Sequence, residues 1–176
     1  MAKGNSKIGS KSTSNSNVIS DFEKSIYKSD NEQAMIITTD GEVIKFGGDE
    51  NHVFGTKEDL QKMDGAIATH NHPNNTIFST TDVSNGIATG NLAEMRIVTK
   101  EGETYTIKNV GNTVEQRRSF NANYYNQNMK ANNNVDAKLR RGEKVDRNEY
   151  VRDFMDKWLS NHATDYGMSY EKGKIK

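Results

Sequence analysis

Apolar residues in the middle of the chain come in short runs of the kind found in buried strands. The run at 34–37 predicts a strand, and Asp40-Gly41 after it is a hairpin-turn signal. Two further runs flank Glu101-Gly102, a second signal of the same kind. We therefore expect strands at residues 34–38, 42–46, 66–69, 95–99 and 103–107.

Helical signals occur beside these strands and dominate after residue 112. A capping-box pattern at 56–59 predicts a short helix that continues to Met63. Between Val151 and Tyr166 apolar residues recur at intervals of three and four, which is typical of one face of a helix. The Asn-rich stretch 121–134 has low helix propensity and predicts a weaker helix. Strands mixed with helices indicate an α/β (α+β) fold with a layered core.

Composition divides the chain into three parts. Residues 1–20 are mainly Ser, Asn, Lys and Gly, which bury too little surface to offset the entropy of ordering, so we expect a flexible leader. Residues 21–111 hold the predicted strands and form the expected folded domain. Residues 112–176 are expected to form a helical C-terminal extension. An apolar content of only 32% agrees with a modest core that carries polar appendages.

Charge and cysteine content exclude several kinds of function. Lys plus Arg equals Asp plus Glu at 24 each, but residues 31–111 hold six basic against twelve acidic residues, and residues 112–176 hold thirteen against nine. An acidic middle argues against a nucleic-acid partner and against a nuclease. The absence of cysteine excludes disulfides, thiolate zinc sites and cysteine nucleophiles. Without a long apolar run or a signal peptide, we expect a soluble cytoplasmic protein and no membrane partner.

The strongest chemical signal is a pair of histidines followed by a proline and, ten residues later, a carboxylate. His70 and His72 lie two residues apart at the end of a predicted strand, so both imidazoles point to one side of the sheet. Pro73 ends that strand because it cannot donate to the ladder. Asp82 falls in the first turn of the next predicted helix, from which its carboxylate can turn back toward the histidines. Two imidazoles, one carboxylate and an open fourth position are typical of a catalytic zinc site.

A simpler interpretation needs no metal. Ser79-x-x-Asp82 is also a capping-box pattern, with Asp in place of Glu, and would begin a helix by itself. Two histidines close together can be ordinary loop residues. The two interpretations of Asp82 are compatible, because one side chain can both cap a helix and bind a metal ion.

These residues, in this order, resemble the JAMM signature of JAB/MPN-type metalloproteases. The residues that carry the resemblance are His70, Asn71, His72, Pro73, Ser79 and Asp82. The sequence His-Asn-His-Pro is most similar to the RadC branch and to JAB-like domains of bacteriophage and mobile-element proteins. The resemblance covers roughly residues 21–111 and implies a JAB/MPN-like mixed sheet flanked by helices. Five residues separate Pro73 from Ser79, where the peptidase branch usually has six or seven, and this shorter loop fits the phage-like branch better.

The resemblance implies a role for each residue of the motif. His70, His72 and Asp82 would bind Zn²⁺, and Ser79 would donate a hydrogen bond to the oxyanion. An upstream glutamate would be the general base, and the resemblance favours Glu32, directly before the first predicted strand. Glu42 on the return strand is the alternative, although a solvated hairpin residue is the simpler interpretation of that position. The implied reaction is hydrolysis of a peptide or isopeptide bond in a protein or peptide substrate.

The same resemblance leaves a second class of function open. A phage or mobile-element assembly is an expected partner, which would place the protein in the cytoplasm of a bacterial host or on a virion. The alternative function is a non-catalytic JAB-like module that retains the fold for a structural or interaction role, as in a phage head protein. An intact set of ligands argues against that role, because a degenerate member would be expected to lose one of them.

Overall fold

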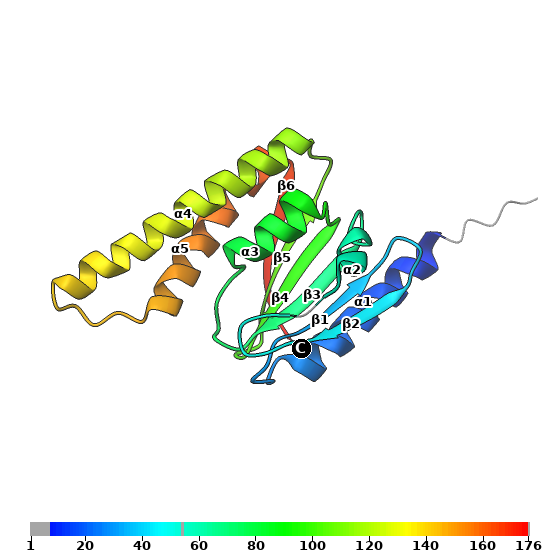
Figure 1. Cartoon of the computed structure of the whole chain (residues 1–176), viewed down its shortest axis with the longest axis horizontal. Helices are drawn as coiled ribbons and strands as arrows, with labels where there is room; N and C mark the ends of the chain where they lie inside the picture. Colours follow the sequence, from blue (N-terminus) through cyan, green and yellow to red (C-terminus); the bar gives the residue numbers. More distant parts are fainter. Residues whose placement is uncertain (1–7, 54, 176) are drawn as a thin grey trace, which may run out of the picture.

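The computed structural model describes residues 8–53 and 55–175, and in these ranges a six-stranded mixed sheet forms the centre of the molecule (Figure 1). The strand order is β2-β1-β3-β4-β5-β6, and all neighbours are antiparallel except β3 and β4. The strands are β1 (Gln33–Ile37), β2 (Val43–Gly47), β3 (Ile67–His72), β4 (Glu94–Thr99), β5 (Glu103–Asn109) and β6 (Met168–Lys174). The sheet flanked by helices confirms the predicted fold class.

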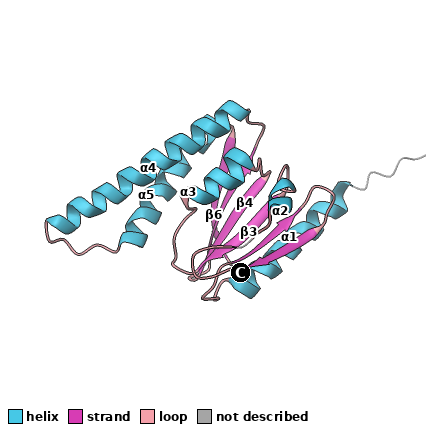
Figure 2. Cartoon of the chain, in the orientation of Figure 1, coloured by secondary structure: helices cyan, strands magenta, loops and turns pink. Residues whose placement is uncertain are grey.

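Helices cover both faces of this sheet (Figure 2). They are α1 (Ile8–Ile26), α2 (Lys57–Gln61), α3 (Thr80–Asp82), the π-helical segment η1 (Val83–Thr89), α4 (Val114–Arg140), α5 (Arg147–His162) and the 3₁₀ turn η2 (Ala163–Tyr166). Successive residues of β1 face opposite layers, as the period of a strand requires. Met35 and Ile37 pack with α1, whereas Ile36 belongs to the larger core under α3, η1, α4 and α5.

The predicted hairpins are present where their turn signals lie. β1 pairs with β2 across Asp40-Gly41, and β4 pairs with β5 across Glu101-Gly102. Both glycines adopt positive φ angles, 92° at Gly41 and 80° at Gly102, a conformation that costs glycine little. The turn signals therefore predicted both hairpins correctly.

The flexible leader expected over residues 1–20 is wrong for the part of it that the structure describes. Helix α1 begins at Ile8, and Ile19, Phe22 and Ile26 are buried against the sheet. Their spacing of three and four residues forms an apolar stripe, which is enough for tertiary packing to stabilise a polar helix. Residues 1–7 lie outside the described residues.

The expected helical C-terminal extension contains more than helices. The Asn-rich segment 121–134 is helical throughout and lies within α4. A reciprocal capping box between Thr113 and Gln116 forms the N-terminus of this helix. Helix α5 was also predicted, but the chain then turns at Gly167 and adds β6 to the edge of the sheet beside β5. Phe120 and Leu159 are fully buried in the larger core. Residues 112–176 therefore share one core with residues 21–111.

No helix within the described ranges is both long enough and apolar enough to cross a membrane.

Candidate metal centre

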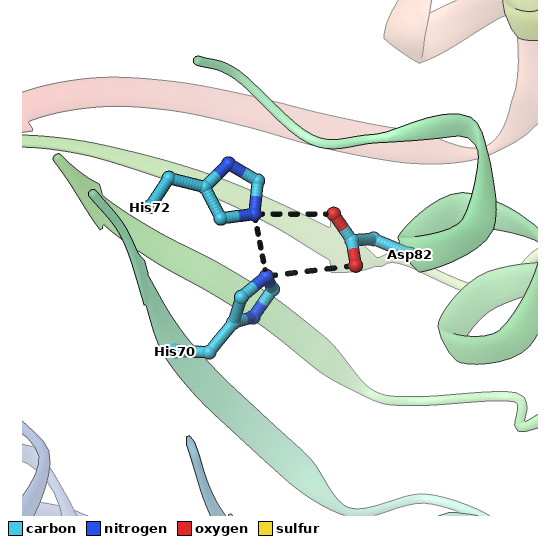
Figure 3. A group of neighbouring side chains, drawn as sticks. All are labelled: His70, His72 and Asp82. Atoms are coloured by element: carbon cyan, nitrogen blue, oxygen red, sulfur yellow. Dashed lines mark hydrogen bonds and ion pairs between the residues drawn. The ribbon is translucent and has the colours of Figure 1, made fainter. Parts of the chain in front are cut away.

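The two histidines of the motif lie at the end of a central strand and face the same side of the sheet. His70 and His72 are in β3, between β1 and β4, and their side chains are largely buried (Figure 3). Their Nε2 atoms lie 2.8 Å apart. The spacing of two residues along a strand produces this convergence without any help from a loop, as the sequence predicted.

Asp82 reaches the same point from the short helix α3. Ser79 is the N-cap of this helix, and the Ser79–Asp82 capping box is complete. The Asp82 carboxylate accepts a hydrogen bond of 2.7 Å from the Ser79 backbone N–H, and its Oδ2 and Oδ1 lie 3.3 Å from His72 Nε2 and 3.5 Å from His70 Nε2. The carboxylate therefore both caps the helix and faces the histidines, so its two predicted roles are compatible in this geometry (Figure 3).

The spacing of these ligand atoms fits one small cation. A tetrahedral site with Zn–N bonds of 2.0–2.1 Å has ligand atoms about 3.3 Å apart. The three observed separations are 2.8, 3.3 and 3.5 Å. The Nδ1 of His72 lies 3.1 Å from the carbonyl oxygen of Thr76, to which a protonated Nδ1 donates. When His72 is neutral with its proton on Nδ1, this bond directs the lone pair of Nε2 toward Asp82 and His70, the orientation a metal ligand needs.

The electrostatics of the group also favour a cation. Burial would raise the pKa of Asp82, but the positive charge and hydrogen bonds that His70 and His72 provide hold it well below its usual range. Burial would lower the pKa of His72, but Asp82 and then Glu32 outweigh this and raise it. The carboxylate is therefore ionised at neutral pH, and its surroundings stabilise positive charge beside it.

Glu32 lies at the edge of the same cavity, whereas Glu42 does not. Glu32 directly precedes β1 and is half-buried, and burial raises the pKa of its carboxyl more than His72 and His70 lower it. Glu42 is exposed and forms an ion pair of 2.9 Å with Lys62. Between the two candidates for a general base, the structure brings only Glu32 close to the metal ligands.

Asn71, the residue between the histidines, holds the backbone on both sides of Glu32. Its side chain faces the opposite side of the sheet and is fully buried. The Asn71 amide oxygen accepts a hydrogen bond of 2.7 Å from Gln33 N–H, and its amide nitrogen donates to the carbonyl of Asn31 at 3.1 Å. Asn71 therefore fixes the backbone position of Glu32 from the opposite face of the sheet.

Ser79 lines the cavity, and the oxygen of its hydroxyl group accepts one hydrogen bond. Its Oγ accepts a hydrogen bond of 3.0 Å from Asp82 N–H, an interaction that uses the oxygen and not the hydroxyl hydrogen. Ser79 is exposed and lines the same cavity as His70 and Glu32. Glu32, His70, Ser79 and Asp82 therefore line the cavity, His72 lies 2.8 Å from His70, and Glu42 does not line it.

A cavity of about 380 Å³ extends from the metal ligands along the sheet. It is lined near the ligands by Glu32, Ser79 and Asp82, and beyond them mainly by apolar side chains. His52, which the sequence did not connect with the site, also lines it, from a loop in which Asp49 lies 3.3 Å from its Nδ1. This volume is within the range of small-ligand sites.

Two supporting contacts come from parts of the chain far away in sequence, and no local pattern predicts them. The Tyr124 hydroxyl of α4 donates a hydrogen bond of 2.5 Å to the carbonyl of Phe78, the residue before Ser79. On the other face, Thr69 of β3 donates to Glu23 of α1 at 2.8 Å. The loop that carries Asp82 and the strand that carries the histidines are thus each held by a remote helix.

Comparison of the chain with models of protein families, with curated proteins and with solved structures finds no match.

Proposed function

We propose that the protein is a zinc-dependent metallopeptidase or isopeptidase of the JAMM type. The observation that carries the proposal is the convergence of His70, His72 and Asp82 beside a cavity that Glu32 and Ser79 also line. A strand end and a helix N-terminus deliver these groups, which are the residues of the JAMM-like motif. The substrate is a protein or peptide, and the proposed setting is the cytoplasm of a bacterial host or a phage or mobile-element assembly.

The residues of this chain then divide the chemistry among them. His70, His72 and Asp82 would hold the zinc ion, which when bound supplies Lewis acidity, polarising a carbonyl and making water ionise near neutral pH. The Glu32 carboxylate accepts the proton of the attacking water and returns it to the amine as the C–N bond breaks. The Ser79 hydroxyl hydrogen donates to the carbonyl oxygen as negative charge develops there.

Metal content tests the first part of this proposal. Zinc per chain is measured by mass spectrometry of the purified protein and of His70→Ala/His72→Ala. The matched control is His52→Ala/His162→Ala, which removes two exposed histidines that do not ligate. We expect one zinc ion in the wild type and the control and none in the ligand variant. No zinc in the wild type, or equal zinc in both double variants, overturns the proposal.

Hydrolysis tests the second part. The zinc-loaded protein is incubated with a proteome digest supplemented with isopeptide-linked peptides, and new termini are identified by mass spectrometry. Glu32→Gln should slow cleavage by about 10²–10⁴-fold, the contribution of a positioned general base, while zinc content is unchanged. Glu42→Gln is the matched control and should cleave like the wild type. A zinc-binding protein that cleaves nothing favours the non-catalytic structural or interaction module instead.

A further inference from the structure

The cavity beside the metal ligands has an apolar end with a definite place in the sheet. Ala34 of β1 pairs with His70 of β3 on one side and with Phe46 of β2 on the other. These three residues therefore form one row across neighbouring strands, which are about 4.8 Å apart. All three line the cavity, so its floor runs without interruption from the metal ligand to the aromatic ring.

Small side chains make this floor hollow. Ala68 lies two residues before His70 on the same face of β3, and it pairs with Ile36 of β1. Ala34 and Ala68 stand where a larger strand residue would fill the space above the sheet. The roof of the hollow consists of η1, and Gly86 brings it close. A Cβ atom at Gly86 would lie 2.8 Å from the sulfur of Met95.

The lining of this end favours uncharged occupants. Its described side chains include Ile36, Phe46, Met63, Leu92 and Met95, which have no group to pair with a charge. No Lys or Arg is among the described residues that line the cavity, and the acidic ones would repel an acidic ligand. The Asp59 carboxylate already accepts two hydrogen bonds from Thr56, at 2.7 and 2.9 Å.

We propose that this apolar end is a substrate subsite for a large uncharged side chain, Leu, Met or Phe, on the residue that flanks the scissile bond. The inference rests on the proposed function and names its substrate class. The two Cα atoms that flank a peptide bond are only about 3.8 Å apart. A carbonyl placed at the metal ligands therefore brings the neighbouring side chain to the row of His70, Ala34 and Phe46. Burial there removes both the ligand side chain and the lining from water.

The test measures binding, so it does not depend on catalysis. Hydroxamates of N-acetylated glycine, leucine, methionine, phenylalanine and lysine are titrated into the zinc-loaded protein by calorimetry, the hydroxamate group serving as the metal anchor. We expect the leucine, methionine and phenylalanine compounds to bind about 10- to 100-fold more tightly than the glycine compound, the gain from burying one apolar side chain. Equal affinities, or tightest binding of the lysine compound, overturn the inference.

Two variants and a control locate the effect. Ala68→Leu fills the hollow and should reduce the affinity of every compound to that of the glycine compound, with unchanged zinc content. Ala137→Leu, at a half-buried alanine in α4, is the matched control and should keep the preference. Leu92→Ala enlarges the hollow and should favour phenylalanine over leucine, which gives a second readout if Ala68→Leu does not fold. If neither Ala68→Leu nor Leu92→Ala changes the order of affinities, the assignment of the subsite is refuted.

A further arm separates this inference from the proposed function. If the protein binds no zinc, the proposed function fails, and the N-acetyl amides of glycine and leucine are compared on the metal-free protein by ligand-observed NMR. A saturation-transfer signal for the leucine amide alone, lost in Ala68→Leu, still supports an apolar subsite. Equal signals for the two amides overturn it.

Discussion

Tyr124 offers the sharpest test of how the C-terminal helices support the candidate site. Its side chain is fully buried in the larger core, and its hydroxyl group donates to the carbonyl of Phe78 at 2.5 Å. The next residue is Ser79, whose N–H group holds the Asp82 carboxylate. Tyr124→Phe removes a single oxygen atom and leaves the ring packing in place, so it tests this one hydrogen bond.

The expected cost follows from burial. Removing one partner of a buried hydrogen bond leaves the other without compensation and costs about 1–3 kcal/mol. We therefore expect the free energy of unfolding, measured by urea denaturation, to fall by about 1–3 kcal/mol in Tyr124→Phe. Zinc affinity, measured by competition with a chelator, should fall by about 10-fold, the low end for groups that orient metal ligands.

The matched control is the neighbouring residue of the same helix. Tyr125 is exposed, with 52% of its surface accessible, so Tyr125→Phe should change stability by less than about 0.5 kcal/mol. Equal stability of the two variants would refute the idea that the hydroxyl of Tyr124 supports the loop. A loss of stability in Tyr124→Phe without any change in zinc affinity would confine its role to folding.

Two further predictions concern carboxylates that pair with side chains of the sheet. Glu23→Gln should lower the free energy of unfolding by about 3 kcal/mol, because Glu23 is buried and its ion pair with Arg96 at 2.7 Å would lose one charge. Glu94→Gln, which changes the more exposed partner of Arg96, should lower it less. A larger loss in Glu94→Gln than in Glu23→Gln would refute the reasoning. Burial would raise the pKa of Glu103, but the hydrogen bond from Tyr105 and nearby cations outweigh it and lower the pKa below the ordinary 4.5. A lowered pKa contributes stability that is fully present above pH 4.5 and is lost as the pH falls through the pKa of the folded state. Glu103→Gln removes this contribution. The free energy of unfolding, measured by urea denaturation from pH 3 to 7, should therefore fall less steeply at acid pH in the variant than in the wild type.

Local sequence patterns predicted the features whose signal lies within a few residues of the feature itself. The hairpins followed from Asp40-Gly41 and Glu101-Gly102, because a tight turn needs a residue that tolerates positive φ. The convergence of His70 and His72 followed from the period of a strand. The approach of Asp82 to them followed from a helix that begins at Ser79. In each case residues close together in the sequence determine the local backbone conformation, so the arrangement can be predicted from the sequence alone.

The remaining features depend on contacts between distant segments. Strand β6 was not predicted because Met168–Lys174 carries little apolar character, and it is a strand because the open edge of β5 offers hydrogen bonds to it. Residues 8–20 of helix α1 were predicted to belong to a flexible leader because their composition is polar. The few apolar residues of this helix suffice only because the far face of the sheet is present to cover them. Tertiary packing decided both cases against local propensity.

Helices α1 and α4 hold the candidate site from opposite sides of the sheet. Behind the sheet, Glu23 of α1 binds Thr69, whose neighbour is His70. In front of it, Tyr124 of α4 holds the loop that leads to Asp82. A ligand set assembled from a strand end and a helix N-terminus keeps its spacing only if both supports are fixed relative to each other. Helices α1 and α4 therefore support the geometry of the centre, although no described residue of either helix belongs to the group of His70, His72 and Asp82.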